Sequence, residues 1–250
     1  MNYSKKLIAL AALLFAGGVA HAETPTVTLQ AGQHLQIGIP RGVGDPVVYN
    51  STGGSFTTTT GVPRAYIGGA ANIVGAGPQV DITSIDVFMA ATAAGTYTNV
   101  RARIQFWDTY TAAGTPIFSA PAGAVITADT GPINTVINTV TTLTINLPSP
   151  VRLNSLTNKG FAVNFQSDTG AGLADDPNLT TPLSINGAQA VGTSAVNAGN
   201  GFYRNASGGT NFNFVPGDLR TFTGITDTRT SLVLRGNSSV PVMLQSFDVN

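Results

Sequence analysis

The sequence predicts an all-β protein, folded as a single antiparallel β-sandwich of the jelly-roll or Greek-key type. The chain has 33 threonines and 19 asparagines but only three lysines and one glutamate. Threonine favours strands and asparagine favours turns, whereas lysine and glutamate are good helix formers. Short strand-like runs recur between glycines, prolines and asparagines, and no amphipathic helix or repeat of fixed period interrupts them. Long connections such as residues 182–200 fit the crossovers of a Greek key.

Strands are expected at intervals along the whole chain. The first two, 26–30 and 34–39, are separated by Ala31-Gly32-Gln33. In the run 80–90, the apolar phase changes between Ile82 and Ile85, and one extra residue near Thr83 would reconcile the two halves as a β-bulge. The other expected strands are 47–50, 100–110, 139–147, 161–165, 201–204, 211–215, 221–225, 230–235 and 240–249.

The first 22 residues have the pattern of a secretory signal peptide. Lys5 and Lys6 precede an apolar run, and Ala20-His21-Ala22 follows it as a small-x-small cleavage site. The run is shorter than the roughly 20 residues that a membrane helix needs. We therefore expect a signal peptide at 1–22, a β-sandwich domain at 23–236 and a C-terminal strand or tail at 237–250. The mature chain is expected to be secreted or held at the cell surface, with the periplasm as an alternative, and to have no membrane span.

The charge of the expected mature chain is low. Ten basic residues stand against 12 acidic ones, and the sequence has no cysteine. A nucleic-acid-binding protein normally carries a basic stripe, which this sequence lacks. The absence of cysteine excludes thiol catalysis, thiolate metal sites and disulfides. A neutral exterior rich in threonine, asparagine and glycine suits a protein that touches neutral polymers or packs against copies of itself.

The run 100–110 predicts a ligand-binding surface. Ala102, Ile104 and Phe106 share one face, which leaves the other face to Arg101, Arg103, Gln105 and Trp107. An exposed indole beside such groups can stack on a sugar ring while its neighbours bind the hydroxyls. The predicted ligand-binding residues are Trp107, Arg101, Arg103, Gln105, Tyr97 and Tyr110. The alternative is that a loop covers this face and that Trp107 packs beneath it.

The segment 166–178 is the candidate metal site. It combines Asp168, Asp175 and Asp176 with several glycines, and Ca²⁺ takes six to eight oxygen ligands from such mixed sources. The only cofactor expected is therefore a structural calcium ion, and no cofactor is certain. The alternative is an ordinary acidic turn with Asx-type hydrogen bonds.

Catalytic patterns are weak. The expected mature chain has one histidine, His34, and no Gly-x-Ser-x-Gly motif. Asp86 and Asp108 lie within strong strand patterns, and a pair of carboxylates can hydrolyse a glycosidic bond. A structural role is the better interpretation, with Arg101, Arg103 or a threonine hydroxyl as the partner of a buried carboxylate.

Three segments, 98–109 (TNVRARIQFWDT), 161–172 (FAVNFQSDTGAG) and 201–214 (GFYRNASGGTNFNF), resemble a type of uncharacterised secreted bacterial β-sandwich domain. The resemblance covers most of the mature chain and implies a sandwich fold, with no catalytic residues to transfer. The run 240–247 resembles a strand found near the ends of many exported bacterial proteins.

Two functions are therefore expected, and a third is ranked below them. The first is an exported, non-catalytic protein that binds a polysaccharide or a cell-surface component. The second is a structural or adhesive subunit that associates with itself, because a net charge near zero resists association poorly and terminal segments can add to a sheet edge. An Asp-dependent glycoside hydrolase is the third.

Overall fold

A computed structural model describes most of the chain, and every regular element in it is a strand. The described residues are 22–23, 27–38, 45–58, 63–74, 77–111, 117–118, 122–154, 158–185, 188–194, 202–205, 219–222 and 228–238. The all-β class is thus confirmed for these residues. No helix in these ranges has the length and apolar character needed to span a membrane. The predicted strands 211–215 and 240–249 lie outside the described residues.

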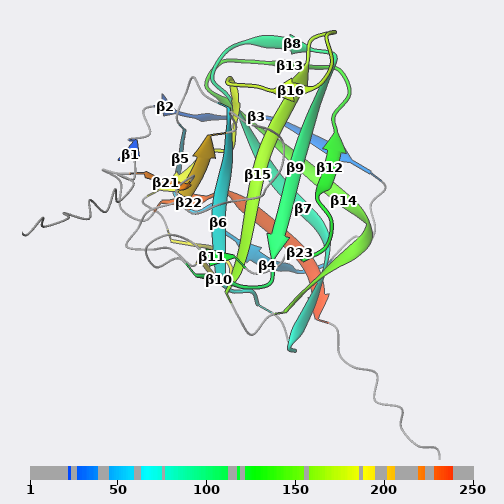
Figure 1. The fold of residues 1–250 in the computed structure, drawn as a ribbon, viewed down its shortest axis with the longest axis vertical. Coiled ribbons are helices and arrows are strands. Elements are labelled where there is room, and N and C mark those ends of the chain that lie inside the picture. Colours follow the sequence, from blue (N-terminus) through cyan, green and yellow to red (C-terminus); the bar gives the residue numbers. More distant parts are fainter. Residues whose placement is uncertain are drawn as a thin grey trace, which may run out of the picture.

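Within the described residues, the largest sheet has nine strands and occupies one layer (Figure 1). Four neighbouring strands end with β12 at one edge of the sheet, and all of them pair in antiparallel fashion. In spatial order they are β6 (Arg64–Asn72), β15 (Lys159–Asp168), β9 (Asn99–Trp107) and β12 (Ile126–Asp129). Beyond β6 lie β20 (Phe202–Asn205), β21 (Leu219–Phe222) and β1 (Ala22–Glu23), while β16 (Ala174–Asp175) pairs with β15 and β19 (Thr193–Ser194) pairs with β6.

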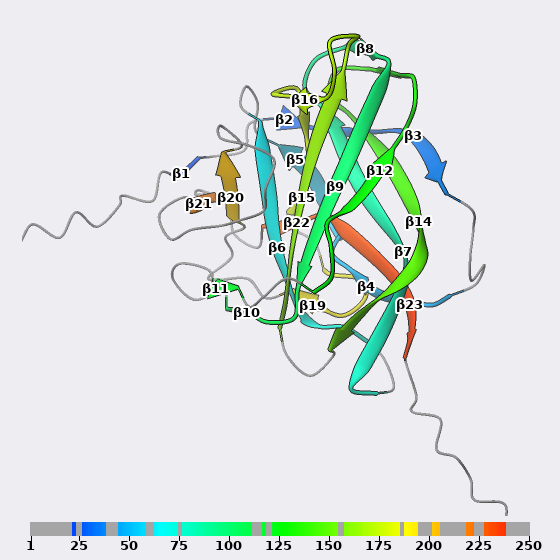
Figure 2. The same cartoon turned by 45° about the vertical axis from the view of Figure 1, so that its right-hand side comes forward.

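The second sheet has six strands in the part of the chain that the structure describes, and it lies behind the first (Figure 2). Its order is β3 (Gln30–Ile37), β14 (Thr139–Asn154), β7 (Gln79–Ala91), β23 (Leu232–Ser238) and β4 (Val47–Asn50), with β17 (Leu179–Thr180) paired to β7. β23 extends two residues past the domain boundary expected at 236.

The remaining strands of the described ranges form three smaller sheets. A four-stranded sheet contains β2 (Val27–Thr28), β5 (Ser55–Thr58), β18 (Leu183–Ile185) and β22 (Arg229–Thr230). Two short pairs join β8 (Gly95–Tyr97) to β13 (Ile133–Thr135) and β10 (Tyr110–Thr111) to β11 (Ile117–Phe118).

The two larger sheets share one hydrophobic core. Ile104 of β9 and Phe161 of β15 belong to the same buried cluster as Val87 of β7 and Leu143 of β14. Each fully buried aliphatic or aromatic side chain contributes about 1.5–3 kcal/mol through removal of apolar surface from water. Burial between the sheets therefore holds the two layers together, and it fixes which face of each strand points inward.

The predicted bulge in β7 is confirmed. Along the neighbouring strand β23, Arg235 pairs with Ser84 and the next residue, Gly236, pairs with Ile82, so Thr83 is the extra residue on β7. Because one residue is skipped, both halves of the strand face the same core. Val80, Ile82, Ile85, Val87 and Met89 are all fully buried in it.

The expectation of purely antiparallel sheets is wrong in two places. β3 pairs with β14 in parallel, and β1 pairs with β21 in parallel. More than 100 residues separate β3 from β14, so no hairpin dictates their relative direction. The two strands expected at 26–30 and 34–39 are also divided differently, because Gln30–Ile37 is a single strand that includes Gly32. A Cβ on Gly32 would lie 2.9 Å from the carbonyl oxygen of Val140, so only glycine allows this approach to β14.

Candidate functional site

The outer face of the nine-stranded sheet carries aligned polar side chains. The inward set of β9 is as predicted, with Ala102, Ile104 and Phe106 in the core. On the opposite face, residues paired across neighbouring strands line up in rows. The first row contains Asp129 of β12, Arg101 of β9, Gln166 of β15 and Asp175 of β16. A second row runs through Thr127, Arg103 and Asn164. We call these seven residues the polar face.

The exposed end of the polar face is an ion pair. Arg101 Nε donates to Asp129 Oδ1 and Nη2 donates to Oδ2, each at 2.8 Å. Asn99 Nδ2 donates to the same Asp129 Oδ1 at 2.9 Å. The hydrogen bond from Arg101 is the main reason that the pKa of Asp129 lies below its ordinary value. The two side chains of the pair are 33% and 45% exposed, so a ligand in solution can reach them.

The inner end of the polar face is buried. Arg103, Asn164 and Gln166 are each less than 10% exposed. Burial raises the pKa of Asp175, while hydrogen bonding to Gln166 and the charge of Arg103 oppose the rise. Oδ1 of Asn164 and Oδ1 of Asp175 are both buried, and neither has a hydrogen-bond partner among the described residues. A buried acceptor without a partner costs about 1–3 kcal/mol, and burial keeps this end of the polar face out of reach of a ligand in solution.

The predicted exposure of Trp107 is wrong. The indole is 3% exposed and the Gln105 side chain is 4% exposed, so neither offers a surface for stacking or hydrogen bonding with a polymer. Gln105 Nε2 instead donates to the carbonyl oxygens of Phe106 and Gly123. Alternation along a strand shows which residues share a face, but it does not show whether that face meets water. The packing alternative for Trp107 is the one that the burial supports.

The two tyrosines are also buried. Tyr97 is 6% exposed and belongs to the core between the sheets, and Tyr110 is 3% exposed. Burial is the main cause that raises the pKa of Tyr97 to about 12, and the neighbouring Asp176 adds to it. Burial raises the pKa of Tyr110 as well. Neither residue extends a binding platform along β9, so the polar face retains only Arg101 and Arg103 from the six residues predicted.

The three candidate metal ligands have separate local partners. Asp168 Oδ1 accepts from the backbone N–H groups of Gly170 at 2.6 Å and Gly172 at 2.9 Å, which lowers its pKa. Both glycines have positive φ, as this tight loop requires. Asp176 accepts from Ser167 Oγ and from the Asn178 N–H.

These contacts follow the Asx-turn alternative. Within the part of the chain that the structure describes, no group of three or more histidine, aspartate or glutamate side chains is placed to hold a metal ion. The prediction that Asp168, Asp175 and Asp176 form one calcium site is therefore wrong, because each carboxylate serves a different set of local donors.

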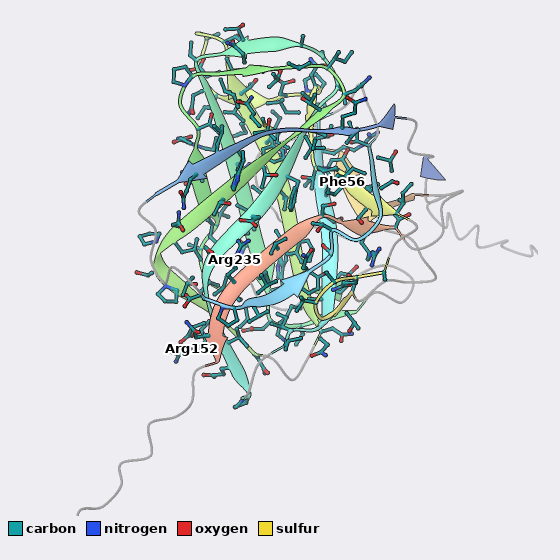
Figure 3. The ribbon with its side chains drawn as sticks, turned by 180° about the vertical axis from the view of Figure 1, so that it is seen from behind. Phe56, Arg152 and Arg235 are labelled. Carbon is teal, nitrogen blue, oxygen red and sulfur yellow. The ribbon has the colours of Figure 1, made fainter. Side chains whose placement is uncertain are left out.

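A second polar network crosses the outer face of the six-stranded sheet. Arg235 Nη1 donates to Asp86 Oδ1 at 2.8 Å, and the hydroxyl of Thr144 donates to the same oxygen at 2.7 Å. His34 Nε2 lies 2.8 Å from the oxygen of Thr144, and it is the donor because the hydroxyl proton is already committed to Asp86. Figure 3 labels Arg235 on this side of the molecule.

This network explains the buried carboxylate of Asp86. Sequence reasoning correctly expected a threonine hydroxyl as partner, but the arginine is Arg235 and not Arg101 or Arg103. Asp108 directly follows the end of β9 in the other large sheet, and its Oδ1 accepts from the backbone N–H of Asn154 at 3.3 Å. Both aspartates thus have structural partners of their own. The chain order gives no signal for the Arg235 contact, because 149 residues separate it from Asp86.

Comparison with known proteins finds no matching family model, and no curated protein or solved structure matches the chain. Any assignment of function to this chain therefore depends on the geometry of the polar face.

Proposed function

We propose that this chain is an exported, non-catalytic β-sandwich protein that binds a neutral polysaccharide or a similar hydroxyl-rich component of a cell surface. The ligand would bind at the polar face of the nine-stranded sheet. The shared core of the two larger sheets supports the sandwich, and the order of their strands is compatible with jelly-roll-like crossovers.

The observation that carries the proposal is the exposed end of the polar face, where the Arg101 guanidinium, the Asp129 carboxylate and the Asn99 amide lie side by side. A sugar hydroxyl is both a donor and an acceptor of hydrogen bonds. The neighbouring donor N–H groups of Arg101 and acceptor oxygens of Asp129 therefore match a pair of neighbouring hydroxyls. A group that carries only acceptors, such as a sulfate or phosphate ester, could not donate a hydrogen bond to the Asp129 carboxylate.

The balance of charge favours a neutral ligand. The polar face contains two arginines and two aspartates, and the exposed pair is already neutralised by its own ion pair. A strongly charged polymer would find no excess of opposite charge there. The side chains also come from four paired strands, which hold them in fixed positions and reduce the entropy lost on binding.

A non-catalytic role is supported by the partners of the aspartates. Asp86 Oδ1 already accepts from Thr144 and Arg235, and Asp86 Oδ2 lies 2.7 Å from a second nitrogen of the same arginine. Two reacting carboxylates of a glycosidase must instead face the glycosidic bond from opposite sides.

Retention on immobilised polysaccharides tests the proposal. The panel should include neutral and anionic polymers, and the protein should be the mature chain. Arg101→Gln is expected to weaken retention on the preferred neutral polymer about 10-fold or more, because a charge-assisted hydrogen bond contributes about 1.5–3 kcal/mol.

Arg152→Gln is the matched control. Arg152 forms the same two-contact ion pair with Asp81, at 2.7 and 3.0 Å, but it lies on the six-stranded sheet. Its replacement should leave retention unchanged. Equal retention of wild type and both variants would contradict the polar face as the site, and no retention on any neutral polymer would overturn the function.

A further inference from the structure

A separate cavity lies between the edges of the two larger sheets. Its volume is about 360 Å³. One wall comes from β12, the last strand of the nine-stranded sheet, and the other comes from β3 and β14 at the end of the six-stranded sheet. The apolar lining consists of Ile37, Ile126, Ala128, Ile145, Leu147 and Pro148.

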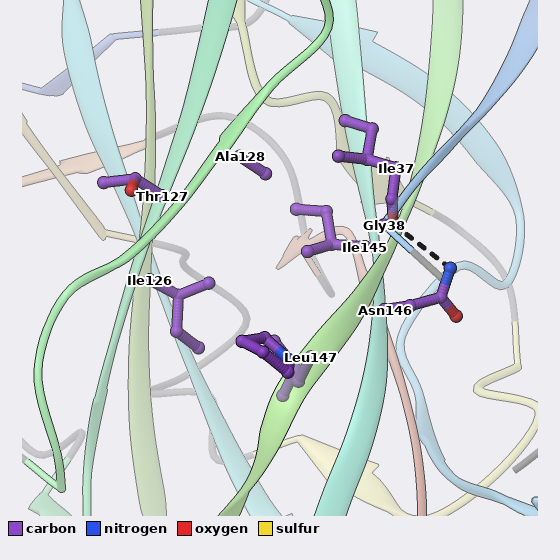
Figure 4. A pocket seen from close by; sticks show the side chains of 9 residues that line it. Ile37, Gly38, Ile126, Thr127, Ala128, Ile145, Asn146 and Leu147 are labelled. Carbon is purple, nitrogen blue, oxygen red and sulfur yellow. Dashed lines mark hydrogen bonds between the residues drawn. The ribbon is translucent and has the colours of Figure 1, made fainter. Parts of the chain in front are cut away.

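The cavity borders the polar face, because Thr127 of β12 is a lining residue of the cavity and also belongs to the polar face. Ile126 and Ala128 pair with Ile104 and Ala102 and share their inward face, whereas Thr127 and Asp129 point outward into the polar rows. Figure 4 shows the side chains of Ile126, Ile145 and Leu147 around the cavity. The side chain of Asn146 points away from it, with its amide nitrogen donating to the carbonyl oxygen of Ile37.

The size and lining of the cavity match an apolar guest. A dry cavity of about 150 Å³ lined by leucine, isoleucine and phenylalanine binds benzene or xenon. The present cavity is more than twice as large and falls within the range of small-molecule sites, about 300–1,000 Å³. Ile37 and Ile126 pack against the core but stay only partly buried, so a guest would remove further apolar surface from water.

The lining also restricts the charge of the guest. Among the described residues that line the cavity there is no lysine, arginine, histidine, aspartate or glutamate. An ionised group that entered it would lose its hydration without gaining a partner. We propose that this cavity binds the hydrocarbon part of a small uncharged molecule, such as the alkyl chain of a primary alcohol. The inference goes beyond the proposed function and does not depend on it.

Fluorescence of the uncharged dye N-phenylnaphthylamine tests the site in the mature protein. The dye is expected to brighten on binding, and decanol is expected to displace it at least 10-fold more effectively than ionised decanoate at pH 8. Ala128→Phe places a ring in the cavity and should weaken dye binding at least 10-fold. Val125→Phe adds the same ring immediately before β12, outside the lining, and should bind the dye normally.

Circular dichroism of each variant shows whether the fold is kept. If Ala128→Phe does not fold, Ile126→Trp at the partly exposed side of the cavity replaces it as the test variant. Several results would overturn the proposal: no brightening with wild type, equal dye binding by the filled and control variants, or equal displacement by decanoate. Dye binding that falls as protein concentration rises would also overturn it, because a second copy would then occupy the cavity. Arg101→Gln should leave dye binding intact, which separates this test from that of the proposed function.

Discussion

Two aspartates of β7 show how the surroundings of a residue decide its effect on stability. Asp86 has a side chain 9% exposed and contacts both Arg235 and Thr144. Asp81 has a side chain 24% exposed, and its partner Arg152 is 60% exposed. Water screens the second pair far more than the first, although the geometry of the two pairs is nearly the same.

Asp86→Asn is therefore expected to lower the free energy of unfolding by about 1–3 kcal/mol, because it leaves a partly buried guanidinium without its counterion. Asp81→Asn should cost no more than about 1 kcal/mol. Urea denaturation of the two variants measures the difference. Equal losses would show that burial does not distinguish the pairs.

Trp107 provides the sharpest test of the packing interpretation. Trp107→Ala is expected to cost about 3–5 kcal/mol, because a 3%-exposed indole would be replaced by a cavity. Unfolding must be followed by circular dichroism, since this is the only tryptophan of the chain. Val136→Ala, at a residue 62% exposed, should cost less than about 0.5 kcal/mol. A stable Trp107→Ala variant that lost polysaccharide retention would support a stacking platform instead.

At the scale of an element, the extra residue in β7 is the feature with the largest expected effect. Deletion of Thr83 would shift Val80 and Ile82 from the core to the outer face and prevent stable folding, because side chains alternate with a period of two. Thr83→Ala keeps the register and loses only the hydrogen bonds of the hydroxyl, chiefly the 2.6 Å bond to Asp45 Oδ2. It should cost about 1 kcal/mol in thermal or urea unfolding. A deletion variant that unfolds as cooperatively as Thr83→Ala would contradict this assignment of the bulge.

The elements also show what a sequence pattern can and cannot predict. The inward faces of β7 and β9 are predictable from apolar spacing, because spacing alone determines which side chains share a face. The continuity of β3 through Gly32 is not predictable from the sequence. Glycine is favoured there because β14 approaches closely, and this is a contact between residues far apart in the chain. The parallel pairing of β3 and β14 has the same origin and leaves no local signal.

The candidate site was predictable only in part for a related reason. Arg101 and Arg103 could be selected from the alternation of one strand. Their partners Asp129, Asn164 and Asp175 come from three other strands, so the polar face exists only once the register of the sheet is known. Burial of Trp107 likewise depends on the whole molecule and not on its own strand.

At the scale of the whole molecule, alkaline pH should have opposite effects in two ranges. Burial lowers the pKa of Lys159 in the folded protein to about 8, while the unfolded chain keeps the ordinary lysine pKa. The folded state therefore releases this proton first as pH rises above about 8, and the free-energy penalty for burying a charged ammonium disappears. Burial raises the pKa of Tyr49 and of Tyr97 to about 12 in the folded protein. Above pH 10 these phenols ionise in the unfolded chain but stay neutral in the folded one, which favours unfolding. The unfolding free energy should therefore rise between pH 8 and pH 10 and fall above it.

Lys159→Met isolates the first effect. This variant should show no rise between pH 8 and pH 10, while the fall above pH 10 should remain, as measured by urea denaturation across that range. The same slope in wild type and variant would exclude Lys159 as the cause.

The most direct test of the proposed function is the affinity of wild type, Arg101→Gln and Arg152→Gln for one neutral polysaccharide that retains the mature protein. Binding at the polar face predicts a loss of about 10-fold or more for Arg101→Gln and an unchanged affinity for Arg152→Gln. Equal affinities for all three proteins would contradict it and would place the ligand elsewhere on the molecule.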